Sequence, residues 1–325
     1  MLRIVRDALS RLPVALAIAI LGCDAAAQQY PSKPVQIVVP LPVGTAIDMA
    51  ARIIGAPLGQ RFGQSVVILN KGGNDGAIGA IEVVRAAPDG YTLLMGTNGP
   101  LSAAPLMTKS PQYDVMNDFT PIGFVGKFTH VMLVNPSLPV KTLNELFAYA
   151  RANRGKVNFG SGNTYSLVST AQLMKLGNME MIHVPYKGEP QALVDLVAGR
   201  VQFMFSTKAV TLPFIKDGRV RALAVTDLKR DPALPNVPTL AEAGVPAFAS
   251  LTYAALVGPA KMPRDVVERI NRELRVVLQL PEVREQLWRL SFEGIGSTPE
   301  ELGATLKTQW ELWSAAVREL NLQNP

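Results

Sequence analysis

Four short glycine-rich segments are the places where this sequence could do chemistry. The first, residues 40–48, contains Gly44 and Thr45 and directly follows an apolar run with the composition of a strand. A loop between a strand and a helix start exposes free backbone N–H groups, and the positive end of the helix favours an anion. The segment lacks the Gly-Lys-Ser/Thr ending of a phosphate loop and the dinucleotide fingerprint. It indicates a site for a small anion, with a plain strand-to-helix turn as the alternative.

The other three glycine-rich segments are residues 72–76, 96–99 and 160–164. In open parallel sheets such loops lie at the carboxyl ends of the strands, where ligands bind in a crevice. Each segment alone is more often a turn than a site. Together they predict a cleft lined by amides and small hydroxyl groups, which suits a carboxylate better than covalent chemistry.

A fifth segment, residues 183–188, joins a predicted strand to a predicted helix. Its Tyr186 is able to hydrogen-bond a ligand and its Lys187 to pair with a carboxylate. The alternative is a packed tyrosine beside a solvent-facing lysine. No Gly-x-Ser-x-Gly motif is present, and the two histidines, His130 and His183, are too few for a multi-histidine metal centre. No nucleophile with a base is therefore identified, while a pair of catalytic carboxylates stays open as an alternative. We expect no metal or cofactor, and we expect both histidines to be structural.

The N-terminal residues resemble an export signal. Three arginines within residues 3–11 precede an apolar core at 12–22, and three alanines at 25–27 give a small-residue cleavage pattern. We expect cleavage after Ala27 and a periplasmic protein. The alternative is a lipoprotein anchored at Cys23, because the sequence Ile-Leu-Gly-Cys, which ends at Cys23, resembles a lipoprotein box. Cys23 is the only cysteine, so no disulfide is expected in the mature chain.

The rest of the chain alternates between strand and helix signals. Strands are predicted at 35–39, 66–69, 91–95, 130–134, 157–159, 181–184, 201–205, 221–225 and 253–257. Capping signals at Thr142 and Thr298 begin two of the helices, and Pro57 is expected to kink or end the first one. This alternation predicts the α/β class with mainly parallel sheets flanked by helices.

Length and charge place further limits on the molecule. The chain has 325 residues, which favours two domains. No low-complexity linker separates them, so we expect the chain to pass between domains through ordered strands near residues 130–134 and 251–257. The formal net charge of +6 is interspersed, with no basic run, so nucleic acid is not an expected partner.

Three motifs resemble those of the receptors of tripartite tricarboxylate transporters, the Bug family. They are Ala-Pro-Asp-Gly-Tyr-Thr at 87–92, the segment 183–188, and Pro-Asn-Val-Pro-Thr-Leu-Ala-Glu-Ala-Gly at 235–244. The resemblance covers the mature chain. It implies a periplasmic binding protein of the type II "Venus flytrap" fold that holds a small carboxylate between its domains. It implies a signal peptide at 1–27, domain 1 at 28–129 and 253–325, and domain 2 at 130–252. It also implies membrane permease subunits as partners, no catalytic residues, and a monomer.

In that family the loop after the first strand wraps a carboxylate with backbone amides and ordered waters. Loops that match residues 97–99 and 161–164 add contacts from the two sides of the cleft. The residues predicted to bind the ligand are Val43, Gly44, Thr45, Ala46, Ile47, Asp48, Thr97, Asn98, Gly99, Ser161, Gly162, Asn163, Thr164, Tyr186, Lys187 and Ser206.

The sequence departs from the family pattern in the predicted site. Thr45 and Ile47 stand where the family has a glycine and a hydroxyl residue, and Leu167 and Val168 stand near the place of a Ser-His pair. Ser206 occupies a position that is often Asp or Gly. The site is therefore predicted to be less charged than usual, and to take a mono- or dicarboxylate with an apolar or aromatic body rather than a citrate-like polyanion. Two other functions stay open: a sensory subunit that presents the ligand to a membrane kinase, and an enzyme acting on a carboxylate in the cleft.

Overall fold

The computed structural model describes residues 30–227, 229–245, 252–320 and 322. Residues 33–325 form a single compact unit that contains two β-sheets. The predicted export signal, including Cys23 and the cleavage point after Ala27, lies outside the described residues. Within the described ranges, every helix is too short or too polar to span a lipid bilayer.

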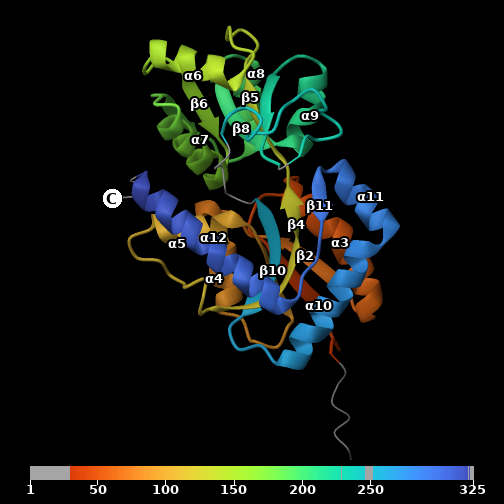
Figure 1. The fold of residues 1–325 in the computed structure, drawn as a ribbon. Coiled ribbons are helices and arrows are strands. Elements are labelled where there is room, and N and C mark those ends of the chain that lie inside the picture. The colour runs from red at the N-terminus through yellow and green to blue at the C-terminus, as the bar shows by residue number, and fades with distance from the viewer. Residues whose placement is uncertain (1–29, 228, 246–251, 321, 323–325) are drawn as a thin grey trace, which may run out of the picture. The chain divides into compact units, whose positions relative to one another are not determined.

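The first sheet has six strands in the order β11-β4-β10-β3-β1-β2. Strands β11, β4, β10 and β2 are labelled in Figure 1. The strands are β1 (Val35–Val39), β2 (Val66–Asn70), β3 (Thr92–Gly96), β4 (Phe119–Phe128), β10 (Tyr253–Pro259) and β11 (Phe292–Gly294). Strand β1 pairs in parallel with β2 and β3, whereas β10 runs antiparallel to β3 and β4. The parallel half supplies the carboxyl-terminal edge from which the predicted anion loop leaves.

The second sheet has five strands in the order β7-β6-β8-β5-β9. They are β5 (His130–Val134), β6 (Asn158–Ser161), β7 (Ile182–Pro185), β8 (Phe203–Thr207) and β9 (Arg221–Val225). Strand β6 is parallel to β7 and β8, and β5 is antiparallel to β8 and β9. The α/β class is confirmed, although both sheets are mixed: β10 and β11 run opposite to their neighbours in the first sheet, and β5 does so in the second.

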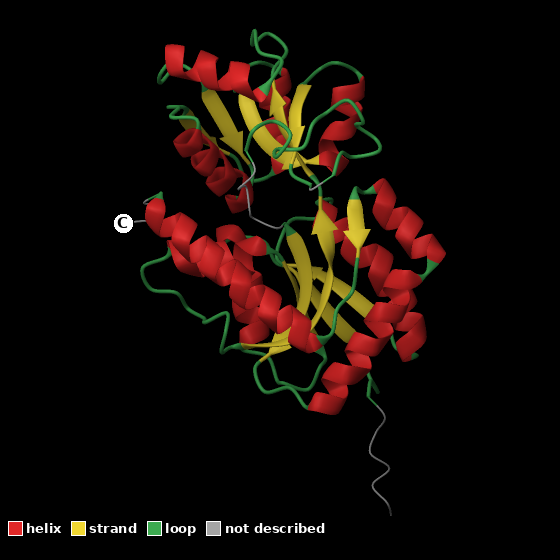
Figure 2. Cartoon of the chain, in the orientation of Figure 1, coloured by secondary structure: helices red, strands yellow, loops and turns green. Residues whose placement is uncertain are grey.

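Helices flank both sheets (Figure 2). Those that follow or flank strands of the first sheet are α3 (Ala46–Phe62), η1 (Asn74–Gly76), α4 (Ala77–Val84), η2 (Gly99–Ala103), α5 (Ala104–Met107), α10 (Arg264–Gln279), α11 (Pro281–Arg289) and α12 (Pro299–Glu319). Those of the second are α6 (Leu143–Ala152), α7 (Thr164–Leu176), α8 (Glu189–Val197) and α9 (Lys208–Lys216). The Thr142 and Thr298 side chains accept from the backbone N–H groups of Glu145 and Glu301 and cap α6 and α12, as predicted. Pro57 lies inside α3, which does not end there.

The chain passes from the first sheet to the second between β4 and β5, at Thr129, and returns between β9 and β10. These points agree with the crossings predicted from sequence, while the domain boundaries themselves stay a prediction. Helix α12 contacts elements that follow strands of both sheets. Its Trp313, which is 1% exposed, packs in one cluster with Ala103 of η2 and with Tyr165 and Val168 of α7. The cluster fixes the start of α7 close to the loop that follows β3.

Candidate functional site

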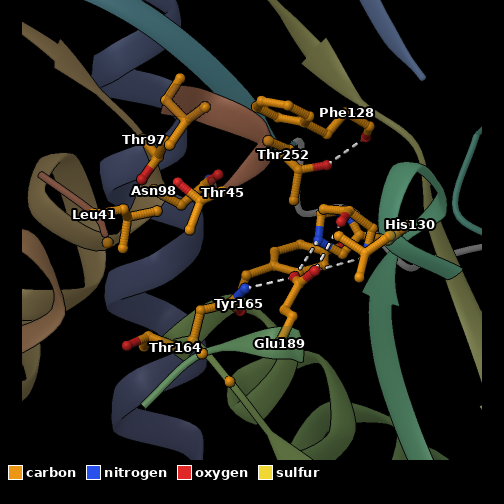
Figure 3. A pocket seen from close by; sticks show the side chains of 18 of the residues that line it. Leu41, Thr45, Thr97, Asn98, Phe128, His130, Thr164, Tyr165, Glu189 and Thr252 are labelled. Carbon is orange, nitrogen blue, oxygen red and sulfur yellow. Dashed lines mark hydrogen bonds and ion pairs between the residues drawn. The ribbon is translucent and has the colours of Figure 1, made fainter. Parts of the chain in front are cut away.

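A pocket lies where the loops that follow strands of both sheets meet (Figure 3). From the first sheet it is lined by the loop after β1 and the loop after β3. From the second sheet it is lined by the starts of α7 and α8 and by the end of β8. The two crossing segments, with Phe128, His130 and Thr252, close one side. Ten of the sequence-predicted residues line this pocket: Thr45, Ala46, Ile47, Thr97, Asn98, Gly99, Gly162, Asn163, Thr164 and Lys187.

The start of α3 presents free backbone donors to the pocket. Thr45 is the residue before the helix, with φ −73° and ψ 158°, and the N–H groups of Ala46 and Ile47 have no acceptor among the described residues. Both residues line the pocket. Free amides at a helix start, reinforced by the helix dipole, attract an anion. The chemistry predicted for this loop is therefore available at Ala46 and Ile47, whereas the Thr45 N–H donates to the Pro42 carbonyl.

The residues on either side of these donors have other roles. Val43 is 71% exposed, and the Gly44 N–H donates to Asp48 Oδ2 at 2.9 Å, so neither residue is in the pocket wall. Gly44 has φ +82°, a conformation that glycine takes at little cost, and Thr45 stays extended. Thr45, which stands where the family has a glycine, is therefore not strained by a positive φ.

Asp48 lies behind the loop rather than in the pocket. Its side chain is buried and accepts from the Gly44 amide, from Arg52 Nε at 3.0 Å and from Asn70 Nδ2 at 3.0 Å. Burial by itself would raise the pKa of the Asp48 carboxyl, but these three hydrogen bonds and the Arg52 charge together hold it below the ordinary value. Asp48 is thus a charged brace that fixes the path of the loop to α3 and β2.

The opposite wall is built around Asn163, the residue before α7. Its Oδ1 accepts from the Ser166 N–H at 2.8 Å, and its Nδ2 donates to Glu189 Oε1 at 2.7 Å. Gly162 lets the two helix starts approach, because a Cβ there would lie 2.2 Å from the Glu189 nitrogen. The starts of α7 and α8 are therefore held together as one surface.

Glu189, the first residue of α8, is a buried acid that sequence reasoning missed (Figure 3). Its Oε2 accepts from the Ser206 hydroxyl and from the Thr207 N–H and hydroxyl at 2.7–3.0 Å, and its Oε1 lies 3.6 Å from His130 Nε2. Burial raises the pKa of the carboxyl, but the hydrogen bonds and charge of His130 and the Thr207 bonds outweigh burial and lower it. Ser206 thus points at Glu189 and does not line the pocket.

Asp75 is the second acid that sequence reasoning missed. It lies in η1 after β2, lines the pocket, and accepts from both the N–H (3.4 Å) and the hydroxyl of Thr164, the first residue of α7. Burial raises the pKa of the Asp75 carboxyl to about 6, although the Thr164 bonds act in the opposite direction. Asp75 and Glu189 thus place two acids in the pocket wall, which the sequence-based interpretation of Thr45, Leu167, Val168 and Ser206 did not include; that the site is less charged than is usual in the family stays a prediction.

The difference in unfolding free energy between the wild type and Asp75→Asn is expected to depend on pH. Above its folded-state pKa of about 6 the Asp75 carboxyl is charged in both states, and the folded state carries the cost of burying it. Below its ordinary value of 3.8 it is protonated in both states, and the cost disappears. Lowering the pH from about 7.5 to about 5 should therefore stabilise the wild type relative to the variant by roughly tenfold in the unfolding equilibrium constant.

Urea unfolding of both proteins at the two pH values measures this difference. The Asp75 charge also affects the pKa of Tyr113, which could add its own pH dependence. Burial and that charge both raise the pKa of Tyr113, so Tyr113 stays neutral between about pH 5 and about pH 7.5 and does not contribute. Thr164 does not titrate. A wild-type-to-variant difference that is the same at both pH values contradicts the prediction.

Two further predicted residues, Ser161 and Tyr186, line a neighbouring second pocket, which shares Asp75, Thr164 and Lys187, among others, with the first. The Ser161 hydroxyl lies 2.6 Å from His183 Nε2, and the Tyr186 hydroxyl donates to Asp195 Oδ2 at 2.7 Å. Burial and the Asp195 bond raise the pKa of Tyr186 to about 12, so it remains a neutral donor that is already engaged. Tyr186 therefore anchors its own loop to α8.

The Ser161–His183 pair is one that sequence reasoning did not nominate. Burial lowers the pKa of His183, which favours the neutral ring. A hydrolytic triad needs a third group that orients the histidine, and among the described residues no carboxylate contacts His183. His130, expected to be structural, instead lines the first pocket with its ring packed 4.4 Å from that of Tyr165.

Comparisons with known proteins agree with this arrangement. The model of the family "Tripartite tricarboxylate transporter family receptor" matches residues 50–322. A protein in the tcbD-tcbE intergenic region of Pseudomonas sp. strain P51 is 38% identical over 296 residues, or 90% of this chain and 88% of that protein. Among solved structures, periplasmic binding protein BugD has a TM-score of 0.83 at 31% identity, with 91% of this chain and all of that chain covered. R. palustris Rpa4515 with adipate has a TM-score of 0.84, also at 31% identity, with 90% and 98% covered.

The family predicted from the motifs at 87–92, 183–188 and 235–244 is thereby confirmed. The match takes in the second sheet, the first sheet except β1, and the pocket-lining loops that follow β2 and β3; the loop after β1 precedes it. The chain belongs to the receptor family of the tripartite tricarboxylate transporters, the Bug family of periplasmic solute-binding proteins.

Proposed function

We propose that this protein is a periplasmic receptor that binds a small carboxylate with an apolar or aromatic body and delivers it to the membrane subunits of a tripartite transporter. The observation that carries the proposal is the pair of free N–H groups at Ala46 and Ile47, at the start of α3, in the wall of the pocket. Each charge-assisted bond from such a donor to a carboxylate contributes ~1.5–3 kcal/mol. Two of them are enough to orient an anionic ligand.

The rest of the pocket is suited to an apolar body. Leu41, Phe128, Tyr165, Val210 and Tyr253 line it. Tyr165 and Tyr253 are at most 5% exposed, so their rings are held by packing and offer rigid apolar surface. A mono- or dicarboxylate with an aliphatic or aromatic body matches these walls better than a citrate-like polyanion does.

Binding would couple to closure, because segments that follow strands of both sheets contact the same ligand. A ligand that touches both walls favours whichever arrangement brings them together. To move such an equilibrium from 1:99 to 99:1, the ligand must favour the closed arrangement by about 5.5 kcal/mol. No chemical step is part of the proposal: the ligand is held and released unchanged.

A thermal-shift panel tests the proposal. We expect benzoate, phenylacetate or hexanoate to raise the melting temperature, and the matched neutral amides, such as benzamide and hexanamide, to have no effect. The amides keep the apolar body and lose only the charge that the α3 start recognises. Tight citrate binding without a response to any apolar or aromatic acid would refute the proposed ligand class.

The partner is tested separately. Cross-linking of the ligand-bound protein to membranes of its host should capture permease subunits. Capture of a membrane kinase instead would favour the sensory alternative, which needs the same pocket.

A further inference from the structure

Two of the helix starts in the pocket, those of α3 and α7, differ in one respect. At the start of α3 the N–H groups of Ala46 and Ile47 are free, whereas at the start of α7 the Thr164 N–H and hydroxyl are bonded to Asp75. We propose that Asp75 is a built-in carboxylate of the pocket, occupying the place where a second ligand carboxylate would bind, and that the ligand therefore carries only one. This inference rests on the proposed function and narrows its ligand class.

Asp75 is held firmly in that place. It comes from the loop after β2, 89 residues before its partner Thr164, which begins α7 after β6 of the other sheet. Gly99 lies directly against it: a Cβ at Gly99 would lie 2.7 Å from the Asp75 carbonyl oxygen and 3.2 Å from Oδ2. The loop after β3 thus lies close beside Asp75 and limits the space into which its carboxylate could move on that side.

The backbone at Asp75 has an unusual conformation. Asp75 has φ +50° and ψ +34°, and the preceding Asn74 has φ +46°. Non-glycine residues rarely take positive φ, and the surrounding structure must hold them there. Here Gly73 and Gly76, also with positive φ, flank the pair. The turn therefore directs the Asp75 carboxylate toward the start of α7 at a conformational cost.

The charges of the pocket also disfavour a second ligand carboxylate. Asp75 and Glu189 are both in its wall, and among the described lining residues Lys187 is the only lysine or arginine. Two like charges within about 6 Å in a partly buried site weaken binding roughly tenfold to a hundredfold. A ligand whose single carboxylate lies at the start of α3 avoids this repulsion. A dicarboxylate of the same length cannot, because its second carboxylate must enter the half of the pocket that holds the two acids.

The test compares ligands that differ only in their second carboxylate. Hexanoate and adipate, and benzoate and terephthalate, are titrated calorimetrically into the wild type and into Asp75→Asn at neutral pH. Asparagine keeps the size of the side chain and an acceptor for Thr164. The wild type should bind the monocarboxylate of each pair at least tenfold more tightly. The variant should reduce that ratio at least tenfold, mainly by binding the dicarboxylate more tightly.

Asp217→Asn is the matched control. Asp217 is exposed at the end of α9, so its variant has the same change of net charge away from the pocket, and its ratios should stay those of the wild type. A wild type that binds adipate or terephthalate as tightly as the monocarboxylate overturns the inference. Equal weakening of both ligands by Asp75→Asn also overturns it, because Asp75 would then only brace the loop.

Failure of the proposed function looks different. In that case none of the four acids binds to the wild type or to either variant, although all three proteins melt cooperatively, and the inference falls with the function. Carboxylate binding with an unchanged ratio in Asp75→Asn overturns the inference alone and leaves the proposed function standing.

Discussion

Replacing Lys208 with methionine is expected to lower the free energy of unfolding by about 3–5 kcal/mol. Lys208 begins α9 and its Nζ forms an ion pair with Asp231, in the segment after β9. The two side chains are only 3% and 4% exposed. Removing the lysine leaves the Asp231 carboxylate buried without its counter-charge, which is far more costly than losing a surface pair.

Urea unfolding measures the loss, and a double variant separates charge from packing. Lys208→Met/Asp231→Asn removes both charges and keeps an oxygen for the Ala233 N–H, which Asp231 Oδ1 accepts at 2.8 Å. We expect the double variant to regain most of the lost stability, because no unpaired charge remains. A single variant that costs less than about 1 kcal/mol would show that water reaches Asp231 and that the pair behaves like a surface one.

The Lys208→Met substitution should also affect the pocket. Lys208 directly follows Thr207, whose N–H and hydroxyl both bond Glu189, and its own N–H donates to the Thr129 carbonyl at the crossing between the sheets. Loosening the start of α9 thus loosens one support of Glu189. The buried ion pair is a part of the framework that positions the pocket, although it does not line it.

Local patterns were enough to predict most of the elements. All nine predicted strands are present, because each is a short apolar run that ends at a turn signal. Strands β4 and β11 were missed. β4 contains Pro121, Gly123 and Gly126, which read as loop residues, and it exists as a strand because β10 and β11 pair with it from distant parts of the chain. Tertiary pairing there overrides local preference.

The site shows the same division between local and distant information. The loops at 45–47, 97–99 and 162–164 were found because a strand, a glycine and a helix start follow one another in sequence. Asp75 and Glu189 were missed because each fits an ordinary local pattern that needs no ligand. Asp75 stands in a Gly-Gly-Asn-Asp-Gly run that reads as a turn, and Glu189 stands where an acid normally stabilises a helix start. Their roles depend on Thr164, His130 and Thr207, and no local pattern contains those pairings.

The second large effect is expected from Ala46→Pro, which should weaken binding of the best monocarboxylate tenfold to a hundredfold without unfolding α3. Proline removes the N–H of Ala46, one of the two donors assigned to the ligand, and the loss of one charge-assisted bond is ~1.5–3 kcal/mol. Ala46 is the first residue of the helix, where proline is well tolerated because the N–H has no partner within the helix.

The chain itself shows that this geometry accepts proline. Thr298 precedes Pro299 at the start of α12 with φ −74° and ψ 164°, and Thr45 precedes Ala46 with φ −73° and ψ 158°. The residue before a proline must be extended, and Thr45 already is. The melting temperature of the variant without ligand should therefore match or exceed that of the wild type, so a loss of binding reports on the missing donor rather than on the fold.

Ala46→Ser supplies the control for added bulk, since it keeps the N–H and adds one heavy atom at the same position. Calorimetric titration of all three proteins should show weakened binding in the proline variant and binding within about threefold of the wild type in the serine variant. Equal weakening in both would mean that space, and not the donor, limits binding at the α3 start. Normal binding by Ala46→Pro would mean that the ligand carboxylate lies elsewhere in the pocket. If it lay at the start of α7, Thr164 would have to break its hydrogen bonds to the Asp75 carboxylate in order to bind the ligand carboxylate.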